Sequence, residues 1–111
     1  MHQASLAEHE RQTTDVRWAH TTSQVLESDF QHNEGTQFRT VDVDCRTTSC
    51  AVVLEWPSRE LAVSEWRRAM MQPTRANCGR QILVPERPPE VTGPILVTML
   101  LDCSTWVETQ S

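Results

Sequence analysis

The chain has 111 residues, a formal net charge of −5 and 38% hydrophobic residues. This length predicts one domain with a modest core, and the acidic balance disfavours nucleic-acid binding, which normally needs a basic surface. The chain has no lysine, so Schiff-base chemistry and general-base catalysis by lysine are excluded. No stretch reaches the roughly 18–20 apolar residues of a membrane span.

The first residues predict a frayed segment or a short helix over 1–14, because Ser5-Leu6-Ala7-Glu8 has the spacing of a capping box. A longer helix is predicted from Asp15 to the turn at Asn33-Glu34-Gly35. Its apolar face follows helical spacing and comprises Trp18, Ala19, Thr22, Val25, Leu26, Asp29 and Phe30.

Two runs of alternating residues, 38–45 and 50–56, predict an antiparallel hairpin closed by the turn Arg46-Thr47-Thr48-Ser49. One register places apolar residues opposite each other on a single face, and it pairs Cys45 with Cys50, Val43 with Val52, and Val41 with Leu54. A slip of one residue would separate these pairs, so we predict this register for the whole hairpin.

A second helix is predicted after Pro57, with Ser58 as its N-cap and Gln72-Pro73 at its end. Arg67 and Arg68 suit its last turn, where cations meet the negative end of the helix dipole. Its predicted apolar face comprises Ala62, Trp66, Ala69 and Met70.

Two further strands are predicted over 78–84 and 95–106, joined by the Pro-rich connection 85–94. The register that opposes Cys78 to Cys103 again gives apolar pairs on one face, although it places Arg80 opposite Leu101. The predicted fold is α+β in the order α-β-β-α-β-β, with one mostly antiparallel four-stranded sheet and the helices on one face. The order of the strands stays open. We expect a single domain over 15–107 and a tail over 108–111.

Four cysteines in a short chain, each pair placed where antiparallel strands would face each other, predict the disulfides Cys45–Cys50 and Cys78–Cys103. Disulfides indicate an oxidising compartment, so we expect a periplasmic or extracellular protein whose export signal or membrane anchor has been removed. A zinc site is disfavoured, because Cys78 and Cys103 are far apart in sequence and all four histidines precede residue 33. No metal and no cofactor is predicted.

Thiol–disulfide chemistry at Cys45 and Cys50 is the alternative function from another class, because Arg46 would favour a thiolate at Cys45. The spacing is not Cys-x-x-Cys, however. Catalytic residues are not predicted. The three glycines form no phosphate loop, and Asp42 and Asp44 on the outer face of a strand are more typical of a solvated edge than of an acid–base pair.

Two segments resemble a group of small exported bacterial domains: Asp15-Val16-Arg17-Trp18-Ala19, and residues 41–52 with Asp44-Cys45-Arg46-Thr47-Thr48-Ser49-Cys50. These domains carry an Asp-Pro-x-Trp-Ala helix start and then a hairpin of the pattern acid-Cys-Arg-Ser/Thr-x-x-Cys. The likeness covers about residues 12–72, with Val16 in place of the usual proline. It implies an envelope or secreted location, and it supplies no catalytic residue because the group has no assigned activity.

The sequence therefore predicts a non-catalytic, disulfide-stabilised domain of the bacterial envelope that binds another protein. Residues 59–87 carry six arginines against three acids, and the four prolines of residues 85–94 make that connection stiff. The predicted partner-binding residues are Arg67, Arg68, Arg75, Arg87, Pro88, Pro89 and Trp106. Membrane contact is expected only through the removed anchor, and the oligomeric state is not predicted.

Overall fold

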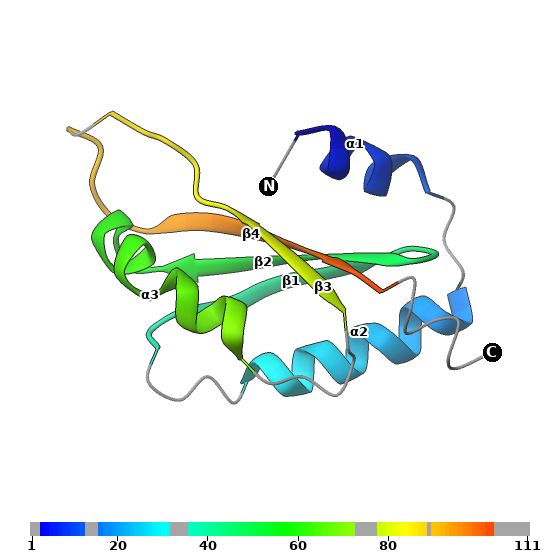
Figure 1. Cartoon of the computed structure of the whole chain (residues 1–111). Helices are drawn as coiled ribbons and strands as arrows, with labels where there is room; N and C mark the ends of the chain where they lie inside the picture. Colours follow the sequence, from blue (N-terminus) through cyan, green and yellow to red (C-terminus); the bar gives the residue numbers. More distant parts are fainter. Residues whose placement is uncertain (1–2, 13–15, 32–35, 73–77, 89, 104–111) are drawn as a thin grey trace.

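A four-stranded antiparallel sheet forms the centre of the molecule, with its strands in the order β1-β2-β4-β3 (Figure 1). The computed structural model describes residues 3–12, 16–31, 36–72, 78–88 and 90–103. The elements in chain order are α1 (Gln3–Arg11), α2 (Val16–Gln31), β1 (Arg39–Cys45), β2 (Ser49–Trp56), α3 (Arg59–Met71), β3 (Gly79–Leu83) and β4 (Ile95–Asp102). The predicted α+β class is therefore confirmed.

Both predicted disulfides are formed, Cys45–Cys50 across the β1–β2 turn and Cys78–Cys103 between the start of β3 and the end of β4. Two disulfides in so short a chain indicate an oxidising compartment outside the cytoplasm. Among the described residues, no helix is both long and apolar enough to cross a bilayer.

The sheet has two unlike faces. The inner face carries the residues of β2 that are most deeply buried, Cys50, Val52, Leu54 and Trp56, and this face is turned toward α2 and α3. The outer face carries the alternate residues of β2, Ser49, Ala51, Val53 and Glu55. The predicted face of α2 is confirmed, because Ala19, Thr22, Leu26 and Phe30 are all buried. The hydrophobic core therefore lies between the inner face and these two helices.

The β1–β2 register is confirmed near the disulfide, where Cys45 faces Cys50 and Val43 faces Val52, but it is wrong for Val41. A bulge between Thr40 and Asp42 pairs Thr40 with Leu54, and Val41 is 45% exposed. Strict alternation would have turned Arg39 inward and Phe38 outward.

The bulge reverses this phase, as bulges do when they insert one extra residue into a strand. Phe38 becomes buried, and its ring meets the ring of Trp56 edge-on at 5.3 Å between centroids. Arg39 instead lies outside, where its Nε donates to Glu55 at 2.7 Å. Burying phenylalanine in place of arginine is the physical reason for the correction.

The β3–β4 register is confirmed, with Ile82 facing Met99 and Arg80 facing Leu101. Arg80 interrupts the apolar pattern, but its polar group is satisfied because the guanidinium donates to the backbone carbonyls of Ala69 and Met70 at the end of α3. Partial burial lowers its pKa, and the charge of Asp29 opposes that effect. Both strands are shorter than predicted, and residues 104–106 lie outside the described part of the chain.

The predicted N-cap of α3 is confirmed, since Ser58 Oγ accepts a hydrogen bond from the Leu61 N–H at 3.2 Å. The predicted apolar face of α3 needs one correction. Ala62 and Ala69 are fully buried, whereas Trp66 is only partly buried and lies beneath the guanidinium of Arg67 at 5.4 Å from the ring centroid.

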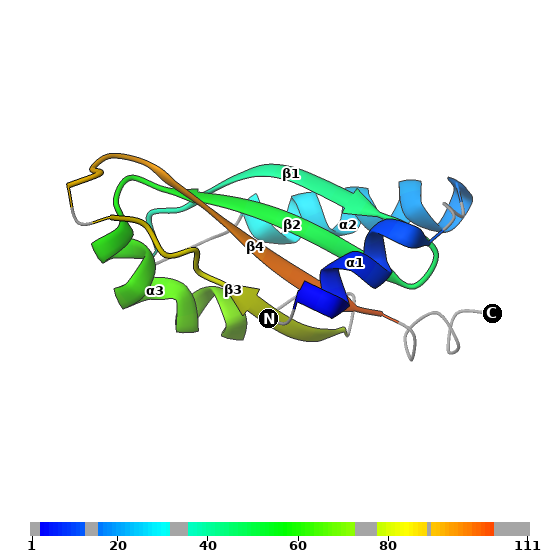
Figure 2. The same cartoon turned by 90° about the horizontal axis from the view of Figure 1, so that it is seen from above.

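The short helix α1 departs from the prediction in two ways. It begins at Gln3, so Ser5 lies within the helix and the predicted capping box is wrong. It also lies against the outer face, on the side opposite α2 and α3 (Figures 1 and 2). The prediction of helices on one face therefore holds for α2 and α3 only. None of the described side chains of α1 belongs to the hydrophobic core, and polar contacts hold the helix in place.

Candidate functional site

The predicted basic residues do not form one face. Arg67 and Arg68 are exposed on the second half of α3. Arg87 and Pro88 instead line a surface hollow of about 330 Å³ at the beginning of that helix, together with Ser58 and Arg59. An α-helix rises 1.5 Å per residue, so Arg67 lies roughly 12 Å along α3 from Arg59. The predicted residues Arg75, Pro89 and Trp106 lie outside the described residues.

Arg87 has a structural role in the Pro-rich connection. Its guanidinium donates to the carbonyl of Gly93 at 2.7 Å and to that of Pro94 at 3.0 Å, across the turn. Gly93 has a φ of 95°, a conformation that residues with a side chain rarely adopt. These contacts fix the shape of the connection and occupy both terminal nitrogens of Arg87, which leaves less of its side chain for a partner.

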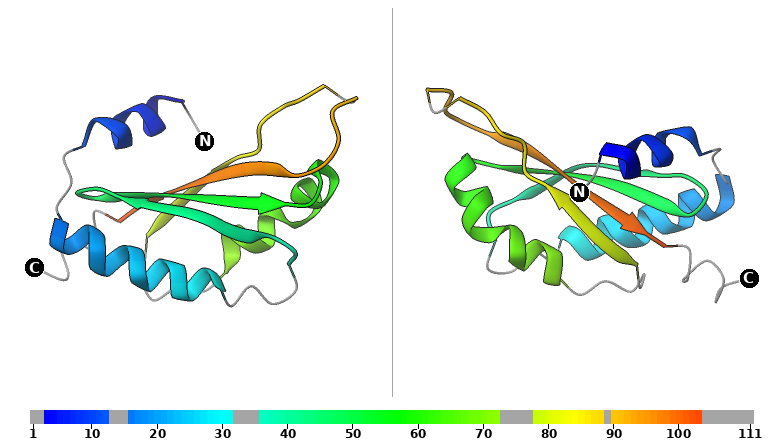
Figure 3. Two further views of the ribbon diagram at one scale, coloured as in Figure 1. Left: turned by 180° about the vertical axis from the view of Figure 1, so that it is seen from behind. Right: turned by 45° about the horizontal axis from the view of Figure 1, so that its top comes forward.

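The outer face of the sheet exposes apolar side chains between two boundaries. At one end α1 covers it, and at the other the Pro-rich connection rises on the same side (Figures 1 and 3). Between them the strand pairing aligns Val53, Thr98 and Leu83 across β2, β4 and β3. Val53 and Leu83 are partly exposed, and Leu96 is 52% exposed. We call Val53, Leu83 and Leu96 the outer apolar patch.

The sequence held a signal for this patch. Residues 95–101 are apolar at almost every position, and residues 50–54 are similarly apolar, whereas a strand with one solvated face alternates. Such runs predict that both faces of the central strands are covered. Here α1 covers one part of the outer face only.

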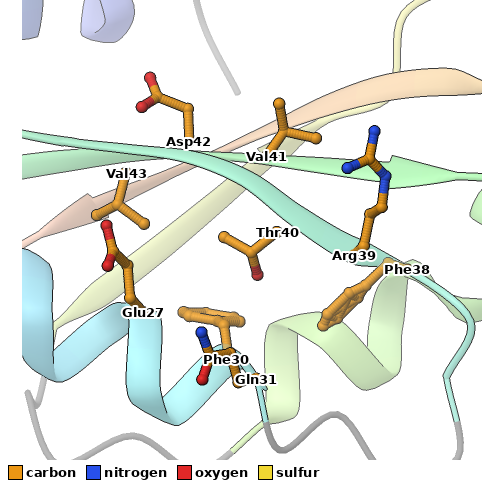
Figure 4. A pocket seen from close by; sticks show the side chains of 9 residues that line it. All are labelled: Glu27, Phe30, Gln31, Phe38, Arg39, Thr40, Val41, Asp42 and Val43. Atoms are coloured by element: carbon orange, nitrogen blue, oxygen red, sulfur yellow. The ribbon is translucent and has the colours of Figure 1, made fainter.

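A second hollow, of about 390 Å³, lies between α2 and the bulge of β1 (Figure 4). Thr40 and Val43 point toward α2, whereas Val41 and Asp42 point to the other side of the strand. Glu27 approaches from α2, so its carboxylate and that of Asp42 lie on opposite sides of β1 and form no acid–base pair. Among the described residues, no group of three or more His, Cys, Asp or Glu is arranged to hold a metal ion.

A polar network joins α1 to the β1–β2 turn. The ring of His9 is 2% exposed; its Nδ1 contacts Ser49 Oγ, and its Nε2 lies 3.2 Å from Asp44 Oδ2. Arg46 extends the network, since it pairs with Asp44 at 3.1 Å and donates to the backbone carbonyl of Glu10 at 2.9 Å. Asp42 and Asp44 thus have different surroundings, since Asp44 contacts His9 and Arg46 while its side chain stays 42% exposed.

The protons in this network can be assigned from its geometry. Gln12 Oε1 accepts hydrogen bonds from the Thr48 N–H at 3.1 Å and from the Ser49 hydroxyl at 3.2 Å. A hydroxyl has one proton, so Ser49 can only accept from His9 Nδ1.

Asp44 is an acceptor as well. Burial raises its pKa, but hydrogen bonds from Arg46 and His9, with their charges, outweigh this and place the pKa below the ordinary value. All of these contacts can be hydrogen bonds at the same time only when both ring nitrogens of His9 carry a proton.

Ser49, His9 and Asp44 have the composition of a catalytic triad, but their protons are arranged for structure. In a catalytic triad the serine hydroxyl donates to the histidine, whereas the Ser49 hydroxyl donates to Gln12 Oε1. The neighbouring Thr48 N–H donates to Gln12 and is not free to stabilise an oxyanion. Sequence reasoning missed this network because His9 and Asp44 are 35 residues apart and no local spacing connects them.

The Cys45–Cys50 disulfide is enclosed by the hairpin and its surroundings. Cys50 is fully buried and Cys45 nearly so. Thiol–disulfide exchange needs a thiolate to reach one of the sulfurs, so these positions favour a structural bond. The guanidinium of Arg46, which the sequence places beside a prospective thiolate, is engaged by Asp44 and by the carbonyls of residues 10 and 12.

Comparison of the chain with protein-family models, with curated proteins and with solved structures finds no match. The resemblance to small exported bacterial domains stays a prediction.

Proposed function

We propose that this chain is a non-catalytic, disulfide-stabilised domain that binds a protein partner through the outer face of its sheet. The outer apolar patch of Val53, Leu83 and Leu96 supports this most directly. Exposed apolar side chains gathered on one face of a domain often mark an interaction site. A sheet stapled by two disulfides also presents this surface rigidly, which lowers the entropic cost of binding.

The location and a further contact region belong to the same proposal. The disulfides and the sequence resemblance support a periplasmic or extracellular domain of the bacterial envelope. Arg67 and Arg68, which are exposed on α3, are proposed as this further region, where their charges would favour an acidic partner. Arg75, Arg87, Pro88, Pro89 and Trp106 stay predicted contact residues.

Site-specific photocrosslinking tests the proposed face. A benzophenone amino acid replaces Leu96 on the outer face, and in a matched control it replaces Val63, which is 47% exposed on α3. The chain is exported in its native host, irradiated, and analysed for covalent adducts. We expect one or a few defined adducts from position 96, in higher yield than from position 63.

A substitution then measures how much the patch contributes. Leu96→Asp should weaken binding of the crosslinked partner at least tenfold, because a charge replaces an apolar side chain in a contact. Adducts from position 63 alone, lost in an Arg67→Gln/Arg68→Gln variant, would assign binding to α3 instead of the sheet. Absence of adducts from both positions would contradict the proposed function.

A further inference from the structure

A network of polar groups attaches α1 to the end of the sheet. The hydrogen bonds of His9 and Gln12, and those that Arg46 donates to carbonyls of the α1 segment, converge on residues 44–49 at one end of the sheet. The described side chains of α1 contribute nothing to the hydrophobic core. Loss of a hydrogen bond from the network around His9 should therefore weaken this attachment.

We propose that α1 is a proton-dependent clasp, fixed to the sheet while His9 is an imidazolium and released more readily once His9 loses a proton. The charged and the neutral ring of His9 differ in the number of hydrogen bonds that they can make. A neutral imidazole has one N–H and one lone pair.

If the remaining proton stays on Nδ1, the lone pair of Nε2 faces the Asp44 carboxylate and that contact becomes repulsive. If it stays on Nε2, Ser49 must donate to Nδ1, and its hydrogen bond to Gln12 is lost. Each neutral form therefore lacks one hydrogen bond that the imidazolium makes.

Charged groups around His9 come from three elements. Asp44 on β1 and Asp102 on β4 are negative, and Asp102 lines the same hollow of about 290 Å³ as His9, as does Glu8 of α1 itself. Arg46 is the opposing positive charge, but it pairs with Asp44. These charged groups surround the ring, and histidine is in general the side chain whose charge changes between pH 5 and 8.

The direction of the response follows from these groups. Loss of a proton from His9 removes one hydrogen bond of the network, so α1 should loosen as pH rises. At strongly acidic pH Asp44 would be protonated and the clasp would weaken again, but the lowered pKa of Asp44 keeps that loss well away from the neutral range. Release of α1 would uncover Leu100, which lines the hollow with His9 and Gln12. The pH response of α1 does not depend on whether the outer face binds a partner.

Nuclear magnetic resonance on the intact, oxidised domain tests the clasp. The ¹⁵N shifts of the His9 ring report protonation, and heteronuclear NOE values of residues 6–11 report the order of α1, both between pH 5.5 and 8.5. We expect the open population of α1 to rise about tenfold as the ring loses its proton. His9→Gln should keep α1 loosened at every pH, and His20→Gln, at an exposed position on α2, should leave the transition unchanged.

Two results would overturn the proposal. One is a neutral His9 ring at pH 8.5 with α1 as ordered as at pH 5.5. The other is the same pH response of α1 in His9→Gln as in the natural sequence. Because His9 lies outside the hydrophobic core, the sheet should stay folded in this variant, and the wild-type titration tests the clasp even if it does not.

Discussion

Glu65 on α3 connects three parts of the structure through one carboxylate oxygen. Its Oε1 accepts a hydrogen bond from the indole N–H of Trp56 at 2.9 Å and another from the backbone N–H of Gln37 at 2.8 Å. Trp56 is fully buried on the inner face, so its N–H has no access to water. Glu65 therefore satisfies a buried donor while it holds the segment before β1 to α3.

We predict that Glu65→Ala lowers the free energy of unfolding by about 1–3 kcal/mol, because it leaves the Trp56 N–H without an acceptor. Glu65→Gln keeps an acceptor oxygen, so it should cost less than about 1 kcal/mol. Urea denaturation followed by tryptophan fluorescence measures both, with Ser64→Ala at an exposed position as the control. A Glu65→Ala variant as stable as the control would show that the Trp56 contact does not stabilise the fold.

At the scale of residues, features that depend on neighbours in the sequence were predictable, whereas contacts between residues far apart in the sequence were not. The Ser58 cap and the buried face of α2 follow from spacing within a few residues, and both are confirmed. Whether Phe38 or Arg39 faces the core depends on a bulge that no short pattern announces. The contact of His9 with Asp44 depends on where α1 docks, which is a tertiary property.

The bulge in β1 determines which residues of this strand face the core. Val41 and Val43 are two residues apart and look equivalent in an alternating sequence. In the structure Val43 packs against the core, whereas Val41 points away from α2 and is 45% exposed (Figure 4). The bulge alone accounts for this difference, because it adds one residue to the strand between Thr40 and Asp42.

We predict that Val43→Ser lowers the free energy of unfolding by about 1–2 kcal/mol through lost apolar burial. Val41→Ser should change it by less than about 0.5 kcal/mol, since the position is at the surface. The two variants lose the same atoms and the same strand propensity, so each controls for the other in urea titrations. Equal losses would mean that both valines face the core and that β1 alternates without a bulge.

The two hairpins were predictable because two kinds of residue pair, cysteines and apolar residues, constrain the same register. In each hairpin the cysteine pair and the apolar pairs favour the same register, and both registers are confirmed away from the bulge. The position of α1 was not predictable, because it is held by polar groups, which leave no apolar periodicity to read.

For the whole molecule, the order β1-β2-β4-β3 places the two disulfides differently in the fold. Each hairpin is consistent with several orders, so the pairing of β2 with β4 could not be read from either one. This pairing places β2, from the first hairpin, beside β4, from the second hairpin, at the centre of the sheet. Cys45–Cys50 then closes a local turn, whereas Cys78–Cys103 ties the edge strand β3 to the centre across the long connection.

We predict that the two disulfides contribute unequally to stability. In the chain-entropy model a bond stabilises by restricting the unfolded chain, and the effect grows with loop length. The sequence separations are 5 and 25 residues. These separations correspond to about 2 kcal/mol for Cys45–Cys50 and about 3.5 kcal/mol for Cys78–Cys103. Both are large against a typical total of about 5–15 kcal/mol.

Paired replacements by alanine test this without changing the number of atoms lost. Cys78→Ala/Cys103→Ala should be less stable than Cys45→Ala/Cys50→Ala by about 1.5 kcal/mol in chemical denaturation. The difference should persist at any salt concentration, because it does not arise from charge.

If the variant lacking Cys45–Cys50 were the less stable one, that bond would be holding the β1–β2 turn, and with it Asp44, Arg46 and Ser49 of the clasp, in the folded state. Heteronuclear NOE values of residues 6–11 in that variant would then show α1 loosened, whereas the loop-length explanation leaves α1 as ordered as in the natural sequence.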